Sequence, residues 1–137
     1  MAEWIEDLEQ ALKRCYDSEP ESEIDALRMF RDVLQNSPRQ VTRHIGRPLD
    51  QDRFEKLAAL SATETIAREM AQPGLVGFMV SGSPNGRYLA TVLTGHSGEE
   101  FMGDGPTEPL AFAVALARAV HKIAAKGRGT RLKSVSN

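Results

Sequence analysis

The side chains best suited to metal chemistry lie in a glycine-rich stretch near residue 100. His96, Glu99, Glu100 and Asp104 are close in sequence and carry the nitrogen and oxygen atoms that divalent cations bind. Their spacing matches no established metal-ligand pattern, and the single cysteine, Cys15, is far away in the chain. We therefore expect a polar loop here, with no metal and no cofactor.

A second candidate is Gly103-Asp-Gly-Pro-Thr107, which precedes a predicted helix. Free N–H groups at a helix start favour anions, but this stretch lacks the lysine of a phosphate-binding loop, and Asp104 and Glu108 would repel phosphate. We expect Thr107 to cap the helix. The alternative is a nucleotide-like ligand held by the loops 81–87 and 95–107 across an oligomer interface, with the following binding residues: Arg87, His96, Asp104 and Thr107.

Nucleophilic catalysis has little support in the sequence. Ser81, Ser83 and Ser97 lie in predicted loops, without the G-x-S-x-G pattern that exposes a catalytic serine. Cys15 lies on an amphipathic helix whose apolar face should be packed. We predict that the protein is not an enzyme.

Charge is unevenly distributed along the chain. Its 137 residues include 17 basic and 19 acidic side chains, and the net charge of −2 excludes a globally basic nucleic-acid binder. Residues 1–36 hold ten acids against four bases, whereas residues 118–137 hold six bases and no acid. An acidic helical face suits a partner with a basic surface. The expected partner-binding residues are Glu6, Asp7, Glu9, Glu21 and Glu23.

Residues 40–56 have the outline of a DNA-reading motif, in which a glycine turn joins two helices. Aligning Gly46 with the turn glycine places Arg47 and Asp52 where the motif needs apolar side chains. Five acids between Asp50 and Glu69 oppose the arginines of this region. Nucleic-acid binding is therefore disfavoured and kept as a third option, which would use four arginines: Arg39, Arg43, Arg47 and Arg53.

Length and composition indicate one domain in a reducing compartment. A chain of 137 residues is typical of a single domain. The lone Cys15 forms no internal disulfide. No apolar run reaches the ~18 residues of a membrane span, and the first ten residues are acidic rather than signal-like. We expect a cytoplasmic protein that is not bound to a membrane.

Hydrophobic periodicity predicts helices in the first half of the chain. Residues 1–36 form an acidic pair of antiparallel helices, the second from about Pro20 to Gln35, with Ser18 and Glu21 at capping-box spacing. Residues 39–49 fit either a helical turn or a strand. Residues 50–72 are helical, and a second capping-box spacing at Ser61 indicates two helices.

The second half changes to a hairpin and a helix. Residues 75–94 contain two apolar runs around Asn85-Gly86, which predicts a β-hairpin, and residues 100–102 fit a short third strand. An Ala-rich helix over 108–126 covers the sheet and ends at Gly127, before a disordered basic tail, 128–137. The fold class is α+β, one domain over 1–127, and the open sheet edges favour a homo-oligomer.

Residues 75–126 resemble the small phage proteins that have a phage ABA sandwich domain. In those proteins a strand pair leads through a polar turn into T-x-P-L-A and an Ala/Leu-rich helix, which Thr107, Pro109, Leu110 and Ala111 match. The resemblance implies a phage or prophage origin, a place inside a bacterial host cell, a layered α/β sandwich and no known active site. It also implies binding to a host protein, sometimes to blunt a defence system.

Overall fold

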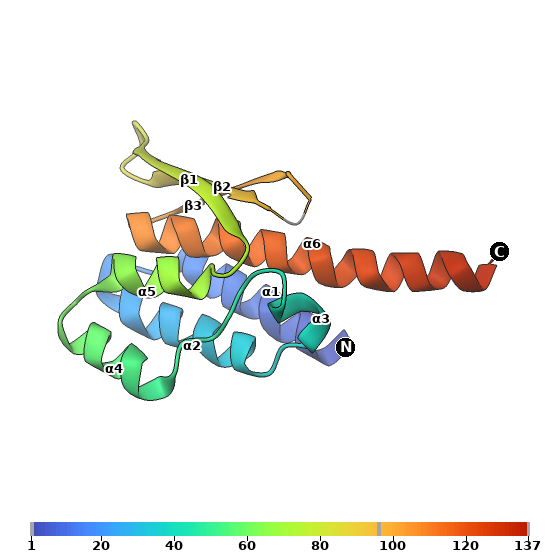
Figure 1. Ribbon diagram of the computed structural model, residues 1–137. Helices are drawn as coiled ribbons and strands as arrows, with labels where there is room; N and C mark the ends of the chain where they lie inside the picture. Colours follow the sequence, from blue (N-terminus) through green and yellow to red (C-terminus); the bar gives the residue numbers. More distant parts are fainter. Residues whose placement is uncertain (1, 96, 137) are drawn as a thin grey trace.

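The computed structural model describes residues 2–95 and 97–136, with side chains described as far as residue 126. The chain forms the predicted α+β fold, with its helices first, then a three-stranded antiparallel sheet and a long last helix. Figure 1 shows the sheet on one side, the other helices on the opposite side, and α6 between them. The core is continuous through these layers.

The first two helices are the predicted antiparallel pair. α1 (Ala2–Asp17) and α2 (Glu23–Gln35) pack through their apolar stripes, and the indole Nε1 of Trp4 donates to the carbonyl of Val33 over 2.8 Å. The chain enters α2 through a 3-10 turn, η1 (Pro20–Ser22), so the helix begins later than predicted. The expected capping box does not form, because no side chain caps η1 or α2.

Three short helices follow. The ambiguous stretch 39–49 contains a single helical turn, α3 (Arg39–Thr42). α4 (Gln51–Ala59) is capped by the Asp50 carboxylate, which accepts the N–H of Arg53 over 3.3 Å. α5 (Thr63–Met70) is a separate helix, as predicted, but its cap is not Ser61. Ser61 has φ 55°, a left-handed conformation that ends α4 and leaves Ala62 at the start of α5.

The sheet contains β1 (Leu75–Gly82), β2 (Tyr88–Thr94) and β3 (Glu100–Gly105), in that order and all antiparallel. The predicted hairpin is confirmed: Phe78 lies opposite Val92, and Gly86 takes the left-handed turn with φ 82°. The third strand is longer than predicted. Residues expected to form a glycine loop before the last helix continue the strand, with Gly105 opposite Tyr88.

Helix α6 (Glu108–Ser136) explains why glycine is needed in β3. A Cβ on Gly103 would lie 2.4 Å from the backbone nitrogen of Ala115, and one on Gly105 would lie 2.8 Å from that of Ala111. The strand therefore lies directly against the helix backbone. The opposite side of α6 packs on α1, α2 and α5, so residues 110–117 are buried all round. This burial explains the alanine content of the helix.

The predicted end of the last helix at Gly127 is wrong, because the backbone of α6 continues as helix to Ser136. The expected disordered tail, 128–137, falls on residues whose side chains lie outside the described part of the chain. Within the described chain, no helix combines the length and the apolar character needed to cross a bilayer.

Candidate functional site

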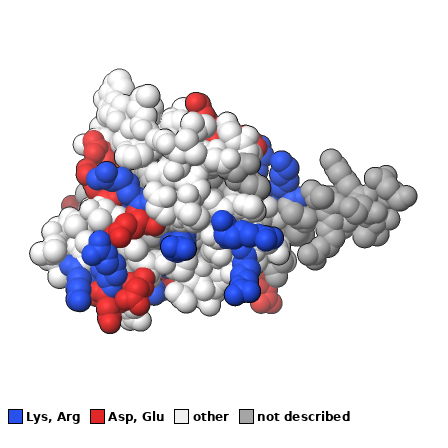
Figure 2. All heavy atoms as spheres, viewed as in Figure 1, with Lys and Arg blue, Asp and Glu red and all other residues white. Residues whose placement is uncertain are grey.

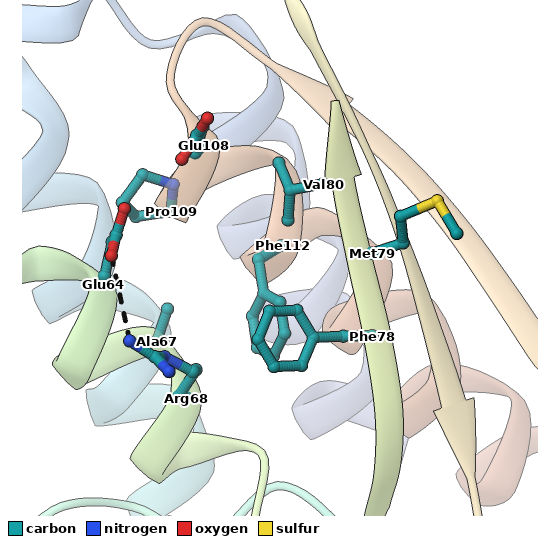
Figure 3. A pocket seen from close by; sticks show the side chains of 9 residues that line it. All are labelled: Glu64, Ala67, Arg68, Phe78, Met79, Val80, Glu108, Pro109 and Phe112. Atoms are coloured by element: carbon teal, nitrogen blue, oxygen red, sulfur yellow. Dashed lines mark ion pairs between the residues drawn. The ribbon is translucent and has the colours of Figure 1, made fainter. Parts of the chain in front are cut away.

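A groove of about 320 Å³ lies between α5, the free edge of β1 and the first turns of α6 (Figure 3). Its floor is formed by two apolar residues, Ala67 and Phe112, which are almost fully buried. Three consecutive residues of β1 form one wall, so the groove follows the strand. The full lining is Glu64, Ala67, Arg68, Phe78, Met79, Val80, Glu108, Pro109 and Phe112.

Two aromatic rings shape the groove. The rings of Phe78 and Phe112 meet edge to face, with centroids 5.3 Å apart. The guanidinium carbon of Arg68 lies 5.8 Å from the Phe78 centroid, so α5 and β1 touch across one end of the groove. Figure 3 shows Met79 pointing away toward the outer face of the sheet. Phe78 stays 46% exposed, which leaves apolar surface for a ligand.

The edge of β1 lacks most of the features that usually prevent a further strand from pairing. Edge strands are normally protected by charged side chains, proline, β-bulges or a covering segment. The eight residues Leu75–Gly82 include no charged residue and no proline, although the pairing with β2 is irregular near Gly77. The opposite edge strand, β3, carries Glu100 and Asp104. β1 is therefore the accessible edge, with backbone N–H and C=O groups directed away from β2.

Charge at the groove is net negative. Glu64 and Arg68 form an ion pair along α5, with 3.8 Å between Oε2 and a guanidinium nitrogen. Glu108, at the start of α6, has no ion pair within the described part of the chain. A positively charged group at the Glu64 and Glu108 end would therefore find an unneutralised carboxylate.

Exposed apolar side chains gather on the sheet. Met79 is 71% exposed and Met102 is 57% exposed. Both pair with Thr91 of the central strand β2, Met79 from β1 and Met102 from β3, so the two methionines lie on the same outer face. Figure 2 shows few charged side chains over β1 and β2 in this view. Most exposed large apolar residues of the described chain belong to the strands: Val76, Phe78, Met79, Leu89 and Met102.

The structure separates the acids that were predicted to form one docking face. Because α1 and α2 are antiparallel, Glu6 and Asp7 lie near the end of α2, whereas Glu21 and Glu23 lie at its beginning. Glu9 faces another neighbour, with its Oε1 3.5 Å from Nε2 of His121. The helices stay acidic on their exposed sides, and the five residues are spread along the helix pair rather than gathered at one point.

The described residues of the alternative ligand site are engaged with each other and with the backbone. Arg87 donates to the carbonyl of Tyr16 over 2.8 Å, stacks on that ring at 4.6 Å and lies 3.7 Å from the Asp104 carboxylate. The hydroxyl of Thr107 accepts the N–H of Leu110, so it caps α6 as predicted. His96 lies outside the described residues. Arg87 and Asp104 do come together, but as an internal pair.

The polar loop near residue 100 is tied to α6. Glu99 binds the Lys122 ammonium, and this hydrogen bond lowers the pKa of the Glu99 carboxyl below its ordinary value. The same ammonium lies 5.9 Å from the centroid of Phe101. Within the described residues, no group of three or more acidic, histidine or cysteine side chains is placed to hold a metal ion.

Sequence reasoning missed the groove. Its one local signal is the uncharged run of β1, which reads equally well as an ordinary buried strand. The rest depends on tertiary contact, since Glu64, Phe78 and Glu108 come from separate elements. No family model matches the chain, and neither a curated protein nor a solved structure is found to match it.

Proposed function

We propose that this protein is a non-catalytic binding module that takes up an extended segment of another protein by adding it as a strand to β1. The observation that carries this proposal is the uncharged free edge of β1 beside a groove with an apolar floor and a net negative rim. Strand addition joins backbone hydrogen bonds, which give affinity, to side-chain pockets, which give selectivity. In this protein the edge of β1 would supply the backbone hydrogen bonds, and the space over Phe112 would supply a side-chain pocket.

The groove favours a segment that combines apolar and basic residues. Alternate side chains of an added strand point to the same face, so one apolar side chain would rest on Phe112 while Val80 flanks it. A lysine or arginine further along would approach Glu64 and Glu108. The acidic helices α1 and α2 would increase the rate at which such a partner arrives.

The resemblance of residues 75–126 to small phage proteins directs the search for the partner. We propose a bacterial host protein with a basic surface, and the blunting of a defence system as one outcome of binding. In this proposal the acidic helices α1 and α2 attract the basic partner over a distance, whereas the partner is bound at β1 and α5.

An immobilised library of random peptides of about ten residues provides a direct test. We expect the protein to retain peptides that pair apolar residues with lysine or arginine. Reversing the groove charge with Glu64→Lys and Glu108→Lys should weaken this binding about tenfold, because it places like charges next to the basic residue.

A matched control reverses two exposed acids of the helical pair, with Glu6→Lys and Glu21→Lys. The total charge changes by the same amount, but these acids lie outside the groove. We therefore expect only a modest loss of peptide affinity, which disappears at high salt. The proposal fails if the protein retains no peptide, or if the control loses as much binding as the groove variant. It also fails if sedimentation shows a stable dimer through β1 that excludes every peptide.

A further inference from the structure

Three arginines gather on a surface that the proposed binding groove does not use. Arg39, Arg43 and Arg47 are exposed and border a shallow hollow of about 700 Å³ on α3 and the loop after it. The other lining residues are Gln40, Thr42 and Pro48, so no carboxylate borders the hollow. Figure 2 shows this group of basic side chains over α3.

These arginines differ from most others in the described chain because no acid neutralises them. Arg28, Arg53 and Arg68 all form ion pairs with carboxylates. Arg39, Arg43 and Arg47 form no ion pair within the described residues. The acids on either side in sequence are engaged elsewhere. Asp32 pairs with Arg31 over 2.9 Å, and the Asp50 carboxylate caps α4.

The backbone that carries the arginines is held firmly in place. Val41 and Ile45 are fully buried between them. Gly46 has φ 81° and packs against Val120 of α6, where an added Cβ would come within 2.8 Å of the valine side chain. The N–H of Arg47 donates to the carbonyl of Gln72 over 3.2 Å. Fixed backbone lowers the entropic cost of holding a charged ligand.

The neighbouring helix adds to the positive charge of this end of the molecule. α3 packs against α6, and α6 continues past Val120 to the exposed Lys126. The sequence then carries further bases and no acid, with Arg128, Arg131 and Lys133.

We propose that the surface formed by Arg39, Arg43 and Arg47 binds the phosphate backbone of nucleic acid. Guanidinium groups bind phosphate oxygens in pairs of hydrogen bonds, and several unneutralised arginines in a row match a repeating anion. The surface offers no recognition helix for base edges, so binding is independent of sequence and depends on counterion release.

Fluorescence anisotropy with a labelled duplex DNA, and with a single-stranded RNA of the same length, tests this proposal in the full-length protein. The triple variant Arg39→Ser, Arg43→Ser, Arg47→Ser should bind about tenfold more weakly at ~50 mM salt. The slope of log affinity against log salt should fall by roughly 2 to 3, because about three phosphate contacts are removed.

The control triple variant Lys13→Ser, Arg14→Ser, Lys56→Ser removes the same charge from exposed positions on α1 and α4. It should bind as the unchanged protein does. The proposal is overturned if neither nucleic acid binds at low salt, if the control loses as much affinity, or if phosphatidylserine vesicles bind at α3 and nucleic acid does not. The peptide assay uses a different surface, so either proposal can fail alone.

Discussion

The variant Gly103→Ala is expected to lower the free energy of unfolding by about 3 kcal/mol. The added methyl group would lie 2.4 Å from the backbone nitrogen of Ala115 and 2.9 Å from the carbonyl oxygen of Ala111. Both atoms belong to the backbone of α6, which cannot move aside as the end of a flexible side chain could. Either the strand or the helix must shift, and the layers on both sides of α6 lose contact with it.

Urea denaturation measures this loss, and Gly77→Ala is its matched control. Gly77 lies on β1, and a Cβ at this position meets nothing within 4 Å. The control should leave stability unchanged or raise it slightly, since alanine restricts the unfolded chain more than glycine does. Equal denaturation midpoints for the two variants would contradict the close approach of β3 to α6.

The second large effect concerns the Cys15 thiol. Burial raises the pKa of this thiol from 9.0 to about 12, although the neighbouring Arg14 guanidinium lowers it. The thiol also donates to the carbonyl of Ala26, with 3.7 Å between sulfur and oxygen. At about pH 8 the thiolate population is roughly a thousandfold below that of an ordinary thiol, and we expect modification by iodoacetamide to slow at least as much.

Mass spectrometry of the folded protein, with the doubly substituted Cys15→Ala, Gln10→Cys as control, checks this expectation. Gln10 is exposed on the same helix, so its replacement should react at the ordinary rate. Stability should also depend on pH, because the folded state keeps the thiol proton and the unfolded state releases it at the ordinary pKa. The free energy of unfolding should therefore hold up to about pH 9 and fall between there and pH 12. Rapid labelling of Cys15 without denaturant would refute its burial.

The sequence predicts much of the fold where one local pattern dominates. Apolar spacing predicts α1 and α2, and Asn85-Gly86 between apolar runs predicts the hairpin. The errors arise where distant contacts override local preference. Gly103 and Gly105 resemble a loop in sequence, yet they form strand because only glycine allows α6 so close.

The candidate site was less predictable, for two physical reasons. Composition identifies acidic helices but not how far apart their acids lie, and the antiparallel pair, itself predicted, places Glu6 and Glu21 at different points along α2. The groove needs α5, β1 and α6 together, so its residues are scattered along the chain. The sequence groups four arginines, of which Arg39, Arg43 and Arg47 border one hollow. Arg53 lies apart from them, paired with Glu69.

Helix α6 is buried on two sides and comes after every element that it covers. During synthesis, α1, α2 and the sheet therefore emerge from the ribosome with their apolar faces uncovered, and they cannot complete a core until residues 110–120 follow. The nascent chain therefore keeps apolar surface accessible to chaperones until late in translation, and its core closes only when this last segment has been made.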